Sequence, residues 1–482
     1  MIVLVFMKIN RGVMNNLDKL QKINNFYCYL KSKYPVTQIT EERQEFLQST
    51  IKKYGYLPLP YIKALEELTD AETLFCLEQK LSNEGIFNDG VFNFDNTSVL
   101  VRNNITDSSW IKRECHDIKL INLGGLGNSN AENQATNFMD WLRQIVILPT
   151  GNKDNNILNT TIYLTPFHPR EFGCAYIPQS SGVSSTLEDK IISKDTNLGA
   201  EEQVKMFINF AQLAGHPVIY DILPQTGRFS KTVLVNPECV RWFNIQTLIK
   251  QICEALDKVY DNSENKVLSQ DLITKYSKEK LQTVIEIYKK YLSGDRKLSL
   301  SEEQKEILQK IHCDKNLLVF KTKISNEMQI KNVQKSLQND VKNIVQKFVK
   351  KTLNQIVEED IENRKEIELE LIKAGLWSLP GGAWDSAGVP IFNNMAKNGL
   401  YPMMKHYNHK GEDVSKHANL DCQSPFYFVY LENGEYNEDV IDFYINFVKK
   451  IVQDFNFDGI RIDHINHVVD EFSEKRWSSN KL

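Results

Sequence analysis

The spacing of hydrophobic and polar residues changes near residue 116, and this change divides the chain. Over residues 15–85, apolar residues recur at intervals of three and four, which is the period of amphipathic helices. Short β-like runs follow over residues 86–113. Beyond residue 116, apolar strand-like runs alternate with helical segments, an order that implies parallel strands joined by crossover helices. The pattern therefore predicts an α/β protein that carries an N-terminal, mainly helical extension over residues 1–115.

The alternating region supplies the predicted strands and helices of one parallel sheet. Apolar runs predict strands at 118–125, 160–166 and 217–223, and helical periodicity predicts helices at 137–146, 201–215 and 438–452. The last helix leads directly into a fourth apolar run that begins near residue 459. Between the third and fourth strands, residues 241–375 are rich in Lys, Glu, Gln, Asn and Ile with helical periodicity, which predicts a helical insertion. The predicted parts are thus 1–115, 116–240, 241–375 and 376–482.

Composition narrows the range of partners and compartments. The chain has 482 residues with 41% apolar and 25% charged residues and a formal net charge of −4, as in a soluble globular protein. Since Lys and Arg are spread out, no nucleic-acid partner is expected. The apolar start, Met1–Met7, is too short to span a bilayer, so no membrane is expected. Cysteines occur singly without a CxxC pair, which favours free thiols in a reducing compartment and a cytoplasmic protein.

The most informative segment is the fourth strand, Gly459-Ile460-Arg461-Ile462-Asp463. By the period-two alternation of a strand, Arg461 and Asp463 share one side of it, and the two isoleucines share the other. A guanidinium beside a carboxylate favours the ionised form of that carboxylate. An ionised Asp at the carboxyl end of a barrel strand predicts a nucleophile.

This segment resembles a motif of the α-amylase superfamily, glycoside hydrolase family 13, in which Gly, Arg, Asp and His stand in this spacing at the end of barrel strand four. The resemblance implies a (β/α)8 TIM barrel, with Asp463 as catalytic nucleophile and Arg461 as the residue that orients it. It also implies that His467 lines the glucan-binding cleft, with Asn466 where many members have Lys. His464, directly after the nucleophile, is similar to the related amylomaltase family. The alternative is a structural Arg–Asp pair that closes a strand.

A second match lies on the third predicted strand, where the family has Asp followed four and five residues later by Asn and His. Asp221 fits that pattern and would support the base of the site, but Gln225 and Thr226 depart from it. In many members the Asn helps to hold a structural calcium, so no calcium and no other cofactor is expected here. The alternative for Asp221 is a strand-end turn.

A third match follows the second strand, where the family often has a Ser/Thr-Pro turn and then a Gly-Tyr pair whose Tyr stacks on the sugar. Thr165-Pro166 and Tyr176 are the nearest equivalents, with a buried core tyrosine as the alternative for Tyr176. His406, His409 and His417 lack an accompanying Cys and a helical frame, so loop histidines and no metal site are expected.

The resemblance also implies what the chain lacks. Retaining glycosidases use two carboxyl groups about 5–5.5 Å apart. The family's acid/base Glu lies on strand five and a third carboxylate follows strand seven, whereas this sequence ends soon after strand four. We therefore expect about the first half of a barrel, with uncovered strand edges. The isolated chain is expected to be poorly stable and inactive, and a polypeptide supplying the second half of the barrel is its expected partner.

The substrate class implied by the resemblance is an α-glucan, a maltooligosaccharide or a sucrose-like sugar, cleaved or transferred through a covalent glycosyl–Asp463 intermediate. Hydrolase, transferase and phosphorylase remain open, because they share the first chemical step. A second interpretation is a catalytically inactive relative that binds glucan or a partner protein. A third is an unrelated TIM-barrel enzyme, which Asp221 and Asp463 at opposite strand ends would favour.

Overall fold

The structure is a computed structural model. It describes residues 4–5, 16–59, 68–83, 85–88, 91–92, 117–126, 137–149, 160–171, 174–224, 226–227, 229–244, 301–303, 331–352, 355–378, 425–428 and 436–463.

A parallel sheet of four strands forms the centre of the fold, as the alternating pattern predicts. These strands are β4 (Asp117–Ile121), β5 (Thr160–Leu164), β8 (Val218–Ile222) and β11 (Gly459–Ile462). They lie side by side in the order in which they occur along the chain, and each neighbouring pair is parallel. The short β1 (Leu4–Val5) adds to the outer edge of β11 in the antiparallel sense. The predicted α/β class is therefore confirmed.

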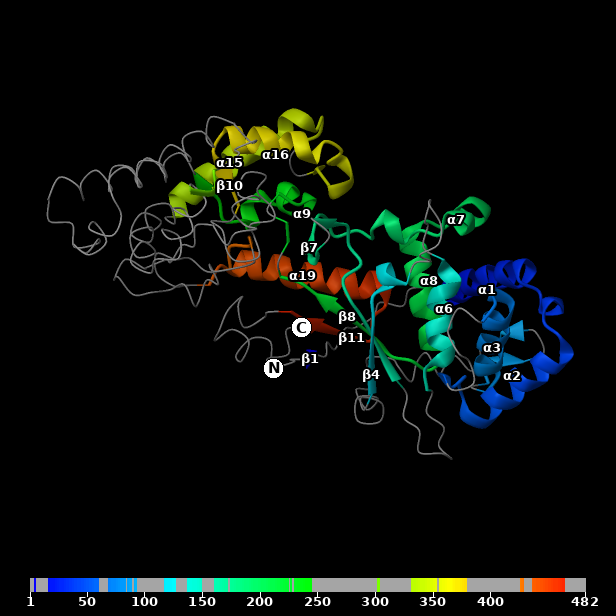
Figure 1. Cartoon of the computed structure of the whole chain (residues 1–482). Coiled ribbons are helices and arrows are strands. Elements are labelled where there is room, and N and C mark those ends of the chain that lie inside the picture. The colour runs from blue at the N-terminus through cyan, green and yellow to red at the C-terminus, as the bar shows by residue number, and fades with distance from the viewer. Residues whose placement is uncertain are drawn as a thin grey trace, which may run out of the picture.

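The alternation of side chains gives this sheet an apolar face and a second face that carries polar groups. Ile162, Tyr220 and Ile460 are almost fully buried on one face. Phe457 stacks on Tyr220 with ring centroids 4.8 Å apart, and Phe455 lies 5.6 Å from Phe457 at the end of helix α19 (Glu438–Phe455). The helix predicted by the strong periodicity of this segment therefore covers the sheet, and Figure 1 shows α19 running across β8 and β11.

Asp458, which lies immediately before β11, connects this strand to β8 and to a preceding helix. Its carboxylate accepts from the Val218 backbone N–H at 2.8 Å and from the Gln212 side chain at 2.9 Å. Gln212 lies at the end of helix α8 (Ala200–Leu213), and Asn456, with φ of 59°, ends α19 in the left-handed conformation. This turn fixes how β11 enters the sheet beside β8.

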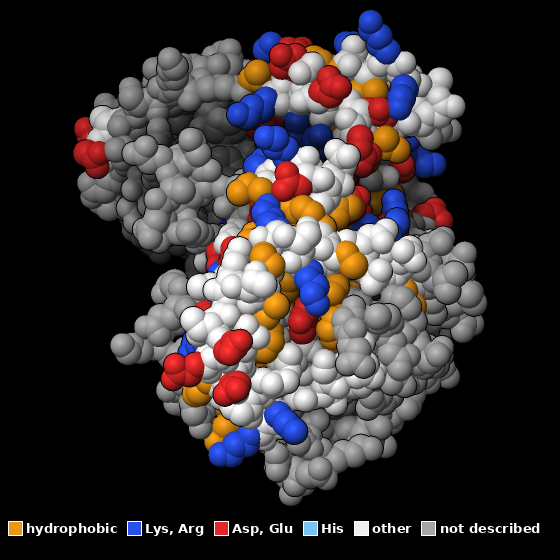
Figure 2. All heavy atoms as spheres, turned by 90° about the vertical axis from the view of Figure 1, so that its right-hand side faces the viewer, with side chains coloured by type: hydrophobic (Ala, Val, Ile, Leu, Met, Phe, Trp, Pro, Cys, Tyr) orange, Lys and Arg blue, Asp and Glu red, His pale blue; other side chains and the backbone are white. Residues whose placement is uncertain are grey.

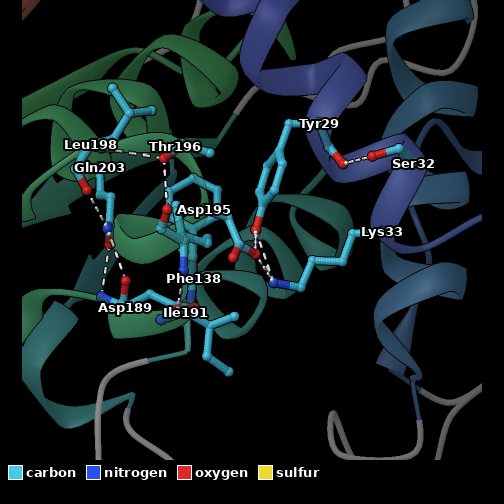
Figure 3. A network of polar contacts seen from close by, with 11 residues as sticks. Tyr29, Ser32, Lys33, Phe138, Asp189, Ile191, Asp195, Thr196, Leu198 and Gln203 are labelled. Atoms are coloured by element: carbon cyan, nitrogen blue, oxygen red, sulfur yellow. Dashed lines mark hydrogen bonds and ion pairs between the residues drawn. The ribbon is translucent and has the colours of Figure 1, made fainter.

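The N-terminal helices share one hydrophobic core with the sheet layer. They are α1 (Asn16–Lys33), α2 (Glu41–Tyr54) and α3 (Asp70–Asn83), and Figure 1 shows them in blue beside α8 and helix α6 (Phe138–Ile147). The Phe26 ring lies 5.1 Å from Phe138 and 6.3 Å from Phe210. The polar contacts in Figure 3 continue this attachment, because Tyr29 of α1 donates to Asp195 at 2.8 Å.

A buried lysine reinforces the same attachment. Lys80 of α3 donates to the backbone oxygens of Ile145 and Leu148, at 2.9 and 2.7 Å, at the carboxyl end of α6. Its ammonium also lies 3.1 Å from Nε2 of His216. Burial, and then the Lys80 charge, hold the pKa of His216 well below its ordinary value. The neutral ring is therefore part of this packing.

The described part of residues 241–375 is largely helical, in agreement with the predicted periodicity. It contains α15 (Lys331–Phe348) and α16 (Arg364–Lys373). At its two ends, β9 (Phe243–Asn244) and β10 (Leu376–Trp377) pair antiparallel, so the chain leaves and returns at one place. Glu358 connects this region to the sheet layer, because its carboxylate accepts from Ser181 at 2.8 and 2.9 Å and from Thr232.

The remaining elements are short. They are β2 (Phe87–Asn88), β3 (Val91–Phe92), β6 (Arg170–Glu171), β7 (Cys174–Pro178), α7 (Lys190–Thr196), α9 (Lys231–Val235) and the 3₁₀ turns Val36–Gln38, Leu123–Gly125, Ser185–Leu187, Pro237–Cys239 and Glu358–Asp360. The β-like pattern over 86–113 thus corresponds in part to the hairpin of β2 and β3.

The two outer edges of the parallel strands differ. The edge of β11 is paired with β1, whereas β4 pairs on one side only among the described strands. Ile118 and Leu120 of β4 are 44% and 52% exposed. Among the described strands, β4 therefore has one unpaired edge, whereas two residues far away in sequence pair with the edge of β11.

The surface visible in Figure 2 mixes acidic and basic side chains, with hydrophobic side chains between them. Within the described ranges, no helix combines the length and the apolar character needed to cross a membrane.

Candidate functional site

The carboxyl ends of three adjacent parallel strands bring five polar side chains together. Asp221 lies near the end of β8, Arg461 and Asp463 lie at the end of β11, Tyr163 lies near the end of β5, and Tyr176 comes from β7. Cross-strand pairing sets Arg461 directly opposite Asp221. Ligand sites of parallel α/β sheets form at this edge, because the loops that follow the strands surround it.

Arg461 connects the two aspartates. Its Nη1 donates to both carboxylate oxygens of Asp221, at 2.9 and 3.0 Å, and its Nη2 lies 2.5 Å from Oδ1 of Asp463. Burial lowers the pKa of this guanidinium, but the bonds and charges of Asp221, with Tyr163 and Asp463, raise it above its ordinary value. Arg461 therefore stays charged and holds two carboxylates from segments that lie 240 residues apart.

Asp221 lies at the base of this cluster, and its side chain has no exposed surface. Burial raises the pKa of its carboxyl group above the ordinary value, while the hydrogen bonds from Tyr163 and Arg461 lower it. Tyr163 donates to Oδ2 at 2.6 Å. Because the side chain is buried, these bonds from protein groups fix the orientation of the carboxylate.

Asp463 lies closer to the surface of the cluster and is 7% exposed. Its backbone N–H donates to the Ile222 carbonyl at 2.9 Å, which extends the pairing of β11 with β8 by one residue. Its carboxylate is thus paired with the Arg461 guanidinium at the end of the strand.

Tyr176 lies within electrostatic range of the same groups. Partial burial, and then the negative charges of Asp221 and Asp463, raise the pKa of its hydroxyl group, whereas Arg461 opposes them. Its predicted role in stacking on a sugar stays a prediction, but its position beside both aspartates follows from these interactions.

Sequence reasoning missed Tyr163 as a member of this cluster. The signal was present in the strand Thr161-Ile162-Tyr163-Leu164, where alternation puts Tyr163 on the side opposite the core residues Ile162 and Leu164. Combined with in-register parallel pairing, the same argument that joined Arg461 to Asp463 would have placed Tyr163 on the face of Asp221.

Other predicted site residues lie elsewhere or outside the described residues. Asn466 and His467 lie outside them, as do Gln225 and the histidines at 406, 409 and 417. Thr226 is buried, and its hydroxyl donates to the Pro178 carbonyl at 2.9 Å. Within the described ranges, no group of three or more His, Cys, Asp or Glu side chains is placed to hold a metal ion.

Asp221 and Asp463 stand at the same ends of neighbouring strands, joined through Arg461. The arrangement that would favour an unrelated barrel, with these residues at opposite ends, is therefore not the one observed. The cluster offers one oriented carboxylate at its surface and a second one buried beneath it. Asp221 is unsuited to protonate a leaving group, because its oxygens are already bonded and shielded from solvent.

A comparison with models of known protein families finds no match to this chain, and a search among curated proteins finds none either.

Proposed function

We propose that the chain contributes the nucleophile side of a carbohydrate-active site that cleaves or transfers α-glucosidic bonds with retention. The observation that carries the proposal is the Arg461 bridge between Asp221 and Asp463. The two segments that resemble the α-amylase superfamily motifs meet through it, although they are far apart in the sequence.

The strand order supports a barrel as the parent architecture. Parallel strands that are neighbours both in sequence and in the sheet, joined by right-handed crossovers, place their helices on one face. Doubly wound sheets instead reverse their strand order and cover both faces. We therefore propose that β4, β5, β8 and β11 correspond to the first four strands of a (β/α)8 barrel.

In the proposed reaction, a carboxylate oxygen of Asp463 attacks the anomeric carbon of an α-glucoside. The bond to the leaving oxygen breaks, and that oxygen takes a proton from a general acid. Water or an acceptor hydroxyl then attacks the same carbon, gives its proton to the deprotonated general acid, and releases the Asp463 carboxylate. Arg461 orients Asp463 through their contact at 2.5 Å, and the general acid is a group other than the five side chains of this cluster.

The test uses a substrate that does not need this acid. Fluoride leaves a glucosyl fluoride without protonation, and 5-fluoro-α-D-glucosyl fluoride slows release of the covalent intermediate. We expect the chain to gain one glycosyl mass, carried by the peptide that contains Asp463, and we expect Asp463→Asn to gain none. Asp195→Asn, which changes an aspartate of α7 whose side chain is 41% exposed, serves as the matched control and should be labelled like the parent chain.

Intact mass measurement followed by peptide mapping reads the result. The proposal is overturned if the parent chain takes no label, if the label is on another residue, or if Asp463→Asn is labelled equally. Adding maltose as an acceptor to the labelled chain then separates transfer from hydrolysis, because transfer yields a longer fluorinated sugar.

A further inference from the structure

Tyr163 is placed so that its hydroxyl group reaches Asp221. The sheet pairs Tyr163 with Ile219, so Asp221 is the diagonal neighbour on the next strand. Diagonal neighbours on one sheet face are about 7–8 Å apart, within reach of an aromatic side chain. The hydroxyl donates to Oδ2 of Asp221 at 2.6 Å, a short distance that is typical of a donor bonded to a charged acceptor.

The guanidinium of Arg461 transmits the position of Asp221 to Asp463. One terminal nitrogen contacts Asp221 and the other contacts Asp463. Because the guanidinium is planar and rigid, fixing one nitrogen fixes the place of the other. A rotation of the Asp221 carboxylate would therefore move the group that orients Asp463.

The buried position of Asp221 makes the tyrosine hydroxyl hard to replace. The side chain has no exposed surface, so solvent cannot supply a substitute donor to Oδ2. Among the described residues, the titratable and charged groups that face Asp221 are Tyr163 from β5, Tyr176 from β7, Arg461 from β11, and Asp463 directly after it. The Tyr163 bond lowers the pKa of Asp221 against the effect of burial, so its loss would favour the protonated form.

We propose that Tyr163 is a positioning residue of the candidate site, which holds the Asp221 carboxylate against Arg461 and thereby sets the contact of Arg461 with Asp463. The effect on Asp463 chemistry rests on the proposed function, whereas the effect on Asp221 does not.

The test is Tyr163→Phe, read first by the carboxyl ¹³C resonance of Asp221 in aspartate-labelled protein, assigned with Asp221→Asn. We expect the pKa of Asp221 to rise by about one unit, since a hydrogen bond to a charged group is lost. Tyr29→Phe removes the same kind of bond from Asp195 and should leave the Asp221 titration unchanged. An unchanged Asp221 titration in Tyr163→Phe would overturn the proposal.

The second readout is the rate of covalent labelling of Asp463 as a function of pH. We expect the acid limb of this profile to move to higher pH by about one unit in Tyr163→Phe. At pH values below the limb, labelling should therefore be about tenfold slower than in the parent chain. In an Asp221→Asn background, the same substitution should have no further effect on the limb. A uniform slowing at all pH values would contradict a positioning role. If the parent chain is not labelled, the proposed function is wrong. The titration of the Asp221 carboxyl group then still tests whether Tyr163 positions Asp221.

A third measurement does not depend on the folding of a position-163 variant. Burial, and then the bond to Asp221, raise the pKa of the Tyr163 hydroxyl group. In tyrosine-labelled Asp221→Asn, the ring ¹³Cζ resonance of Tyr163 should therefore titrate at lower pH than in the parent chain. An equal titration in both proteins would overturn the proposal.

Discussion

Two clusters in the described part of this protein join a tyrosine, an aspartate and a cation, one at the surface and one at the strand ends. In the surface cluster, Tyr29 and Lys33 of α1 contact Asp195, whose side chain is 41% exposed (Figure 3). In the other, Tyr163 and Arg461 contact Asp221, whose side chain has no exposed surface. The chemical groups are closely similar, so the difference between the clusters isolates the effect of burial.

The two aspartates respond to these surroundings in opposite directions. Hydrogen bonds from Tyr29 and Lys33 lower the pKa of Asp195, because little desolvation opposes them. Burial raises the pKa of Asp221 despite comparable bonds. A charge that is removed from water depends on its partners, whereas a solvated charge is largely independent of them. Only the buried cluster therefore has the coupling expected of a site that controls the ionisation of its groups.

The largest expected difference between the clusters is in stability. Arg461→Met leaves Asp221 buried without its cation, and we expect a loss of about 3–5 kcal/mol in the free energy of unfolding. Lys33→Met removes the cation from the exposed cluster and should leave stability close to that of the parent chain. Urea denaturation measures both. Equal effects of the two substitutions would remove the basis of the comparison.

The next difference is the sign of the pH dependence of the contribution that each aspartate makes to stability. Because the pKa of folded Asp195 is below the ordinary value of 3.8, its contribution to stability is present above that value and is lost as pH falls through the folded pKa. Because the pKa of folded Asp221 is above 3.8, the folded state holds the proton more tightly. Its contribution therefore becomes less favourable as pH rises from 3.8 through the folded pKa.

Unfolding of the parent chain, Asp195→Asn and Asp221→Asn over a series of pH values tests these signs. The stability of the parent relative to Asp195→Asn should rise with pH, and its stability relative to Asp221→Asn should fall with pH. Slopes of the same sign for the two pairs would contradict the assigned directions.

The smallest expected effect is on salt response. At about 1 M salt the screening length falls to about 3 Å, which weakens interactions between solvated charges but has less effect on shielded ones. In 1 M NaCl, the small stability difference between the parent chain and Lys33→Met should disappear. The difference between the parent chain and Arg461→Met should persist. A loss of both differences in salt would indicate that solvent reaches Asp221.

The sequence predicted the elements of the fold well where periodicity and end signals agreed. The helix that contains Gln203 and Gln212 and the strand that contains Asp221 lie within a residue or two of their predicted bounds. Pairings between distant segments were not predictable, since they follow from packing and not from local pattern. Leu4 and Val5 lie beside Ile460 and Arg461, a contact that no short window of sequence indicates.

For the candidate site, alternation along one strand was enough to propose the contact of Arg461 with Asp463. It was not enough to show that Arg461 also binds Asp221, because that contact depends on the register between β8 and β11. The contact of Tyr163 with Asp221 was missed because it also depends on the register between strands. In addition, a strand tyrosine among apolar residues is more often part of a core.

By itself, the sequence determined the alternation of strands and helices, the parallel arrangement that this order imposes, and the face of β11 that carries Arg461 and Asp463. These follow from local periodicity and from the length of the connections. The tertiary structure alone decided that Asp221 is fully buried, that Arg461 binds two carboxylates, and that Tyr163 donates to one of them. Burial and cross-strand register arise only when distant segments pack together, and they decide which of the chain's many carboxylates has its ionisation controlled by the protein.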